Sequence, residues 1–302
     1  MYLIADTPVT TRLIPTFHSP SWRSWACSLQ HAARNLAGAV TKIGLYTGRY
    51  HAMELSLRQI ALVAAQLAPI ETTLVEIFDV MPCHRDPAVA AYGLENVLLP
   101  CGEQFLEIVA PTRADTAAGR FLERRAGDGG YMVITQCDDH EARRAHLAAL
   151  GIRIAHEFKA TGFRNMQLHP RDTGGSFLEI DQQLGDVGDW LPAGPRWRNH
   201  VRTTRVRGIA AAEIQADDPQ ALAAHWAAIL ELPVSSTAGV PSIALSQANV
   251  RFVPCSDGRP EGLAGLDMLT VDRAAILAAA SARGINTHEW GFSVCGMRWR
   301  LL

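Results

Sequence analysis

Apolar positions recur along the chain in a fixed order. A short run with strand alternation is followed by a stretch with helical spacing and then by further short apolar runs. In the first copy, Ile70, Leu74 and Ile77 share one face of a predicted helix, because residues three and four apart lie on the same side. Strands are expected before and after this helix, at residues 59–63, 93–99 and 103–109.

Three further copies follow the first. In the second, Asp138 and Glu141 have the spacing of a capping box, and the helix is expected to end at Gly151. The third begins near Gly208, with Asp218 as the N-cap and Pro219 as the first helical residue. The fourth begins near residue 263, and its helix closes at residue 284. Each copy is expected to be a β-α-β-β-β unit.

The repeat defines the predicted fold and its divisions. One such unit buries little surface alone, so two units are expected to pair into one curved sheet with helices outside. The predicted fold class is α+β, with four β-α-β-β-β modules paired into two domains that have curved mixed sheets. The expected domains are residues 57–183 and 207–302. Residues 184–206, rich in Gly, Pro, Trp and Arg, form the predicted linker.

Residues 1–56 have a different composition. Basic residues dominate, and Asp6 is the lone acid before Glu54. A basic, acid-poor leader is typical of an organelle transit peptide, whereas the apolar core of a secretory signal is missing. We expect an upstream extension instead, either disordered or due to a misassigned start, with Met53 as the true start.

Composition narrows the class of protein. Of 302 residues, 48% are hydrophobic and 19% charged, and the net charge is −2. This balance predicts a globular protein without a nucleic-acid surface. The longest apolar run is interrupted by Gln66, so no membrane span is expected. Six cysteines without C-x-x-C spacing indicate a reducing compartment, and the predicted location is the cytoplasm.

Two predicted strands carry a glutamate among apolar residues. The segment LHPRDTGGSFLEI ends in a strand whose alternation places Phe177, Glu179 and Asp181 on one face. The strand at residues 103–109 places Glu107 on one face in the same way. If the two units are related by a pseudo-twofold axis, both glutamates point into one hollow. Confined together, two carboxylates need a cation, or one of them keeps its proton.

The segments LPCGEQFLEIVAP, AGRFLERRAGDGG and LHPRDTGGSFLEI resemble methylmalonyl-CoA epimerases in order and spacing, and glyoxalase I more loosely. Both belong to the vicinal oxygen chelate superfamily. The resemblance covers about residues 57–182. It implies a cup in which a divalent metal ion is held from four positions, here Gln59, Glu107, Met132 and Glu179. It also implies that Glu107 and Glu179 act as catalytic groups.

The four positions depart from the epimerase pattern, which has His at the first and third. Gln59 is similar to the ligand of glyoxalase I and stays an oxygen ligand, so the predicted metal ligands are Gln59, Glu107 and Glu179. The soft thioether of Met132 suits copper(I) rather than the divalent ions of this chemistry, and it weakens the site.

Three functions follow from the resemblance. The first is a metal-assisted lyase, isomerase or epimerase that acts on a small carbonyl or carboxylate compound. The second is a non-catalytic small-molecule binder, as in antibiotic-binding relatives of the same fold. The third is an extradiol-type dioxygenase, which is disfavoured because Gln59 and Met132 replace the histidines of its two-His-one-carboxylate set. The expected partner is a small-molecule substrate or ligand.

The second half is expected to lack this chemistry. Ala211 stands at the first-strand position, and Arg251, Arg298 and Arg300 stand where acids would be needed. With no acid expected in its hollow, this half is predicted to be a structural partner, a lid or a dimerisation surface, which leaves a homodimer open. Binding of an anion by these arginines is the alternative.

Several charged side chains are expected to be solvated. The histidines fall on predicted loops or helix surfaces, where exposure is the default. A connecting helix carries a basic face that is also expected to face solvent. These residues are His84, His140, His146 and His156, and Arg120, Arg124 and Arg125.

Overall fold

The structure, a computed structural model, describes residues 55–185 and 188–302. The predicted N-terminal extension lies outside the described residues, apart from its last two positions. Within the described part of the chain, no helix is long and apolar enough to cross a membrane.

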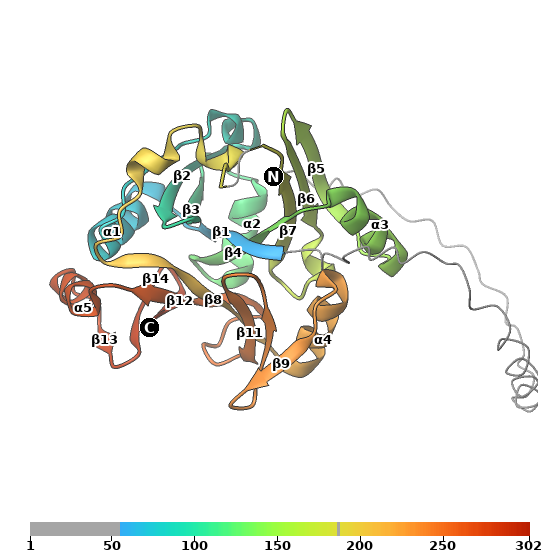
Figure 1. The fold of residues 1–302 in the computed structure, drawn as a ribbon. Coiled ribbons are helices and arrows are strands. Elements are labelled where there is room, and N and C mark those ends of the chain that lie inside the picture. Colours follow the sequence, from blue (N-terminus) through green and yellow to red (C-terminus); the bar gives the residue numbers. More distant parts are fainter. Residues whose placement is uncertain (1–54, 186–187) are drawn as a thin grey trace, which may run out of the picture. The chain divides into compact units, whose positions relative to one another are not determined.

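Seven strands of the first half form one mixed sheet (Figure 1). They are β1 (Leu55–Val63), β2 (Leu94–Cys101), β3 (Gln104–Pro111), β4 (Gly129–Cys137), β5 (Ile154–Ala160), β6 (Phe163–Leu168) and β7 (Phe177–Gln183). Their order is β2-β3-β1-β4-β7-β6-β5. The central strands β1 and β4 are antiparallel, and each has a parallel neighbour, β3 and β7 respectively.

Eight strands of the second half form another sheet with the same central pattern. They are β8 (Val206–Ala216), β9 (Val234–Thr237), β10 (Val240–Ala244), β11 (Asn249–Pro254), β12 (Gly262–Thr270), β13 (Thr287–His288), β14 (Gly291–Val294) and β15 (Met297–Leu301). Strands β8 and β12 are antiparallel, with β11 and β15 as their parallel neighbours. The predicted α+β fold class with two curved mixed sheets is therefore confirmed.

The first unit has the three strands predicted by range but lacks the fourth strand of the β-α-β-β-β pattern. Before β2, the chain makes only an isolated bridge between His84 and Leu98, followed by the 3₁₀ helix η1 (Pro87–Tyr92). Pro82 and Pro87 flank this bridge, and proline has no N–H group to donate to a strand ladder. The prolines therefore limit the pairing to a single residue.

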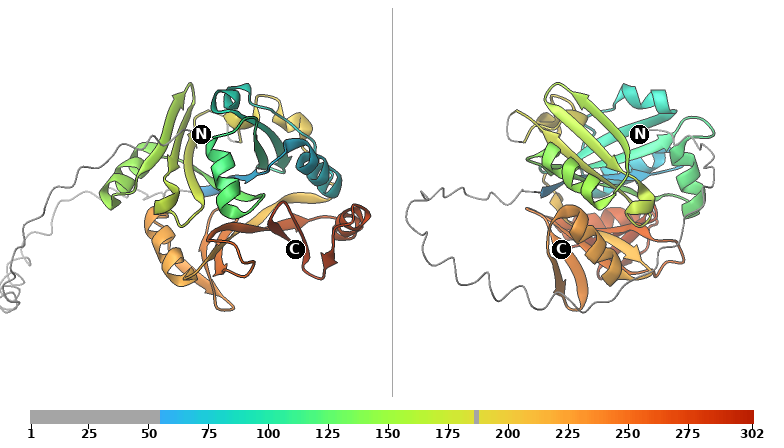
Figure 2. Two further views of the ribbon diagram at one scale, coloured as in Figure 1. Left: turned by 180° about the vertical axis from the view of Figure 1, so that it is seen from behind. Right: turned by 90° about the vertical axis from the view of Figure 1, so that its right-hand side faces the viewer.

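Five α-helices lie in the described residues. They are α1 (Leu67–Phe78), α2 (Ala117–Arg125), α3 (His140–Leu150), α4 (Pro219–Leu230) and α5 (Arg273–Ala282). Asp218 caps α4 as predicted, since its side chain accepts a hydrogen bond from the backbone N–H of Ala221. The cap of α3 is Asp139 instead of the predicted Asp138. Figures 1 and 2 show α1 beside α5 and α3 beside α4.

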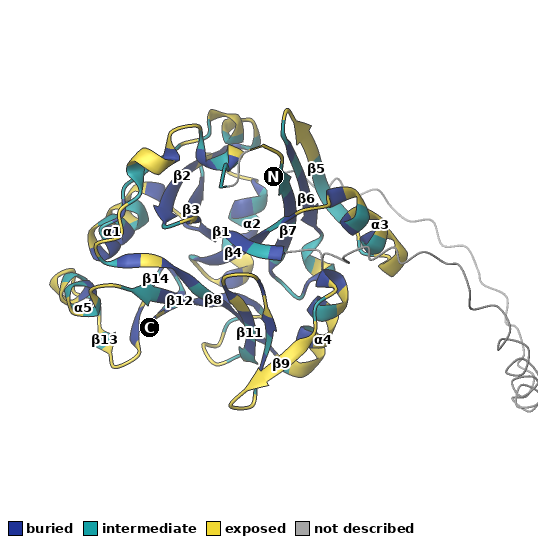
Figure 3. Ribbon diagram, viewed as in Figure 1, coloured by how far each residue is buried: buried dark blue, intermediate teal, exposed yellow. Residues whose placement is uncertain are grey.

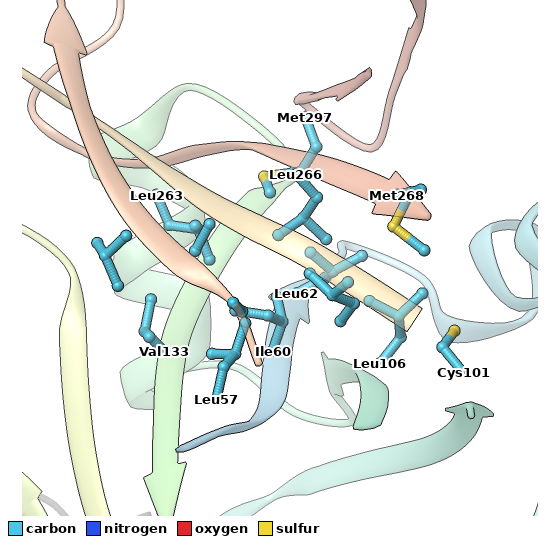
Figure 4. Close-up of a cluster of buried hydrophobic side chains, with 14 of the residues drawn as sticks. Leu57, Ile60, Leu62, Cys101, Leu106, Val133, Leu263, Leu266, Met268 and Met297 are labelled. Atoms are coloured by element: carbon cyan, nitrogen blue, oxygen red, sulfur yellow. The ribbon is translucent and has the colours of Figure 1, made fainter. Parts of the chain in front are cut away.

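The two sheets and four of these helices share one apolar core. From β1, Leu57, Ile60 and Leu62 point into it, and from β12, Leu263 and Leu266 do so. Figure 4 shows these side chains meeting between the sheets. Most of the long strands are buried along most of their length, whereas the edge strands β5 and β9 contain no buried residue, and β9 is exposed throughout (Figure 3). Each sheet therefore has one face in the shared core and one face turned away from it.

The described part of the predicted linker packs on the outward face of the first sheet. Trp190 and Trp197 are each 2% exposed and belong to the apolar cluster on that face. The short 3₁₀ helix η3 (Leu191–Ala193) follows Trp190, and Trp197 is the first residue of a second one, η4 (Trp197–His200). This stretch therefore covers the sheet face that carries Glu107.

Two side chains predicted to be solvated are buried instead. Arg125 at the end of α2 is 2% exposed, and its guanidinium donates to the backbone carbonyls of Pro260, Glu261 and Leu263. His140, the first residue of α3, is fully buried. Sequence alone assigned both to a helix surface, but the second sheet covers Arg125.

Candidate functional site

A cavity of about 540 Å³ lies on the outward face of the first sheet, and we call it the cup. All four positions singled out by the family resemblance line it, namely Gln59, Glu107, Met132 and Glu179. Its apolar wall comes from β2, β3, β4, β5, η1 and the segment after residue 188, through Val89, Tyr92, Leu94, Leu98, Val109, Ile134, Phe158, Trp190, Leu191 and Pro192. The structure thus brings together Gln59 and Glu179, which lie 120 positions apart in the sequence.

Strand geometry places the polar side chains of the cup. On β3 and β7, alternation puts Glu107 and Glu179 on the outward face, as the sequence predicts. On β1, the register with β4 shifts between Leu57 and Gln59, which marks a β-bulge at Arg58. Because of the bulge, Arg58 and Gln59 both contact residues of the outward face.

Both oxygens of Glu107 accept hydrogen bonds from amide groups. Gln59 Nε2 donates to Glu107 Oε2 over 2.9 Å, and Asn96 Nδ2 donates to Glu107 Oε1 over 2.7 Å. Both amide side chains are buried. The carboxylate is therefore held by two neutral donors from the strands on either side of β3.

The orientation of each amide is determined at its other end. Trp190 Nε1, which can only donate, bonds to Gln59 Oε1 over 2.7 Å. The backbone N–H of Asp86 bonds to Asn96 Oδ1 over 2.8 Å. Since both amide oxygens are occupied by donors, both NH₂ groups must face Glu107.

Met132 is also engaged by an amide. Gln167 Nε2 on β6 lies 3.3 Å from the Met132 sulfur, and both side chains are buried. A thioether is a weak acceptor. The side chain at this third position of the family pattern is therefore contacted by an amide from β6, which is separated from β4 by β7 in the sheet.

Glu179 forms an acid pair with Asp181. Both point to the outward face of β7, and Asn165 Nδ2 donates to Asp181 Oδ1 over 3.0 Å. Burial raises the pKa of Glu179, and it raises the pKa of Asp181 well above its ordinary value, with the charge of Glu179 as the next cause. Two adjacent buried carboxyls cannot both ionise cheaply, so we expect the pair to share one proton.

The pKa of Glu107 is raised as well. Burial is the largest cause, and the charge of Glu179 adds to it, whereas the hydrogen bonds from Asn96 and Gln59 act in the opposite direction. Because the charge of Glu179 raises the pKa of Glu107, the two carboxyl groups interact electrostatically across the cup. The cup is therefore an acidic site in largely apolar surroundings.

Two of the histidines predicted to be solvated line the cup instead. His84 comes from the bridge before η1, and His156 comes from β5. Burial lowers the pKa of His156 to about 4, so this imidazole is neutral near pH 7. His146 on α3 is partly buried, and its Nε2 contacts the carbonyl of Ala228.

The donor set, as arranged, does not fit a resident divalent metal ion. Such an ion needs the oxygen of Gln59 and lone pairs of Glu107, but Gln59 turns its NH₂ group toward Glu107. Nowhere in residues 55–185 and 188–302 do three His, Cys, Asp or Glu side chains form a group that could hold a metal. The metal site predicted from the resemblance stays a prediction.

The outward face of the second sheet differs from its prediction. Register places Ala211, Arg251 and Arg300 at the positions of Gln59, Glu107 and Glu179. Acids were not expected there, yet two buried carboxylates pair with the arginines. Arg251 binds both, with 2.5 Å to Glu213 and 2.6 Å to Asp267, and Arg298 lies 2.6 Å from Glu213. These ion pairs neutralise the carboxylates of this face, whereas the acids of the cup have no arginine partner among the residues that the structure describes.

The comparisons with known proteins bear on the fold. The chain matches no protein-family model and no curated protein. Among solved structures, a mutant of 4-hydroxymandelate synthase from Streptomyces coelicolor is similar, with a TM-score of 0.60 and 14% identity over 77% of this chain and 76% of that chain. At 14% identity, the likeness shows a shared fold and nothing about activity.

Two epimerase structures are also similar over a part of the chain. Methylmalonyl-CoA epimerase from Mycobacterium tuberculosis has a TM-score of 0.38 and 21% identity over 43% of this chain and 88% of that chain. A Streptomyces coelicolor methylmalonyl-CoA epimerase in complex with 2-nitronate-propionyl-CoA has 0.39 and 20%, over 43% and 97%. The likeness to 4-hydroxymandelate synthase shows a fold of the vicinal oxygen chelate type, so the resemblance stated from the sequence is confirmed at the level of the fold.

Sequence reasoning missed the amide and indole groups that surround the acids. Asn165 and Gln167 stand two apart on β6 in FRNMQL, and both are buried. Alternating amides in an apolar strand were a readable signal of a polar hollow. Asn96 and Trp190 gave no comparable signal, because their roles depend on which strand and which segment fold over Glu107.

Proposed function

We propose that the chain is a small-molecule-binding protein that holds an organic ligand in the cup without a resident divalent metal ion. The observation that supports this most is the closed hydrogen-bond set around Glu107, in which Gln59 and Asn96 take the place a metal ion would need. A cavity of about 540 Å³ with a mostly apolar wall has the size and character of an organic ligand site.

The first test is metal binding. Titration with Co²⁺ or Mn²⁺, followed by calorimetry and by metal analysis after desalting, should give no stoichiometric ion at micromolar concentration. A tightly bound ion that Glu107→Gln removes would contradict the proposal. It would support the metal-assisted lyase, isomerase or epimerase, in which Glu107 and Glu179 act on the substrate after the Gln59 and Asn96 bonds have broken.

The second test is ligand binding in the cup. N-phenyl-1-naphthylamine, a neutral apolar probe, should bind once per chain with increased fluorescence. Val89 on η1 lines the cup, so Val89→Trp should fill it and weaken the probe about tenfold or more, which is about 1.4 kcal/mol. Ala90→Trp is the control, because Ala90 is an exposed neighbour on the same 3₁₀ helix. Equal binding to both variants would place the probe elsewhere.

A further inference from the structure

The amide groups of the cup are turned toward acceptors of the protein itself. One bond from each of the NH₂ groups of Gln59, Asn96, Asn165 and Gln167 goes to Glu107, Asp181 or Met132. Asn165 lines the cup and is 3% exposed, yet its Oδ1 has no donor among the described residues. A buried acceptor without a donor is costly, so the protein alone does not satisfy the polar groups at this end of the cup.

In the described part of the chain, the acids of the cup have no permanently charged cation beside them. Among the described residues that line it, none is Lys or Arg; the basic side chains are those of His84 and His156, of which His156 is neutral near pH 7. The nearest buried guanidinium on β1, Arg58, is used elsewhere, since it donates to the carbonyls of Glu103 and Gly188 and lies over aromatic rings. The second sheet shows the contrast, because there Glu213 and Asp267 are each paired with arginine.

The wall of the cup suits an organic cation. Tyr92, Phe158 and Trp190 present aromatic rings to the cavity, and aromatic faces attract ammonium groups. The remaining wall is aliphatic, and the volume far exceeds that of a single ion. A bare metal ion would leave most of this surface uncovered.

We propose that the ligand of the cup is an organic cation, a protonated amine or amidine on an apolar body, whose N–H groups face Glu107 and Glu179. This inference rests on the proposed function and adds the chemical class of the ligand. A positive charge between the two glutamates is balanced by them, and the charged hydrogen bonds are stronger than those of a neutral group of the same shape.

The test compares three probes that share one ring system and differ in charge. They are 2-naphthylmethylamine as the cation, 2-naphthylmethanol as the neutral form and 2-naphthoate as the anion. Calorimetry near pH 7 on the full chain should give a dissociation constant about tenfold lower for the amine than for the alcohol, with the carboxylate weakest.

Two variants assign the preference to the cup. Glu107→Gln should remove most of the preference for the amine over the alcohol, since Gln loses the charge. The readout is the ratio of the two dissociation constants, because the new NH₂ group faces the NH₂ of Gln59 or Asn96 and disturbs the binding of both probes. Glu95→Gln should change nothing, because Glu95 is exposed on the same β2 strand that carries Asn96 and does not line the cup. A circular dichroism spectrum like that of the wild type verifies the fold of each variant.

The outcomes separate the two proposals. Equal affinity for amine and alcohol, or an amine preference that survives in Glu107→Gln, overturns the cationic ligand and leaves small-molecule binding in place. Val89→Trp should weaken the binding of all three probes about tenfold or more. If none of the probes binds, or if Val89→Trp does not weaken their binding, both the ligand class and the proposed function are overturned.

Discussion

Glu179 and Asp181 are two residues apart on β7, so strand alternation alone places both on the outward face. The sequence could predict this, and it could predict that Glu107 faces the same way. It could not predict the partners of Glu107, because Asn96 and Trp190 reach it only through the pairing of β2 and the path of the chain after residue 188. The bulge at Arg58 was also hidden, since it changes the alternation of β1 without a glycine to mark it.

The acid pair makes stability depend on pH. The folded protein holds the proton of Asp181 above the ordinary pKa of 3.8, so the stabilising effect of that proton is complete at low pH and is lost as pH rises through the raised pKa. Asp181→Asn cannot ionise and keeps a donor toward Glu179. It should therefore be more stable than the wild type at about pH 8, by about 1 kcal/mol or more, with the difference shrinking toward about pH 4.

Urea unfolding at several pH values measures this effect. Asp138→Asn is the control, because Asp138 is exposed at the end of the same sheet and its side chain is not part of the pair. A stability difference between Asp181→Asn and the wild type that does not change with pH would show that the two acids do not share a proton.

Element boundaries followed local signals closely where capping and alternation were both present. Asp218 and Pro219 begin α4 as predicted, and Gly151 ends α3. The missing strand of the first unit and the cap at Asp139 depend on details that the repeat does not determine, namely proline spacing and the exact register of the first helical turn. Burial of Arg125 was unpredictable, because the carbonyls that bind it belong to the loop before β12.

Arg125 gives a test at the scale of elements. It connects the end of α2 to the backbone at residues 260, 261 and 263, so Arg125→Ala leaves three carbonyls without their donor. Hydrogen bonds to charged groups are each worth about 1.5–3 kcal/mol, and we expect a loss of about 3 kcal/mol in the free energy of unfolding. Arg124→Ala is the matched control. It removes an exposed arginine that lies over the ring of Phe121, and it should cost under about 1 kcal/mol. Equal losses in urea unfolding would contradict a role for the buried hydrogen bonds.

At the scale of the whole molecule, the repeat predicted two sheets but not the core between them. The inward residues of β1 and β12 are apolar. The same apolar pattern is expected whether helices or a second sheet cover this face, so the sequence does not tell the two arrangements apart. The close approach is visible at Gly130 on β4, where an added Cβ atom would lie 2.5 Å from the carbonyl oxygen of Leu263. Only a glycine allows the strands to lie this near.

Because the core is shared, the two sheets should unfold together. Gly130→Ala forces β4 and β12 apart, so the free energy of opening should fall by about 2 kcal/mol in both sheets, as for other overpacked cores. Hydrogen exchange followed by mass spectrometry measures it separately in peptides from β1 and β4 and in peptides from β8 and β12. Gly119→Ala on α2 is the control, since its added Cβ would meet only the Thr116 side chain, at 3.2 Å. If Gly130→Ala accelerates exchange in one sheet and leaves the other at its wild-type rate, the sheets have separate cores, and the cup depends on the first alone.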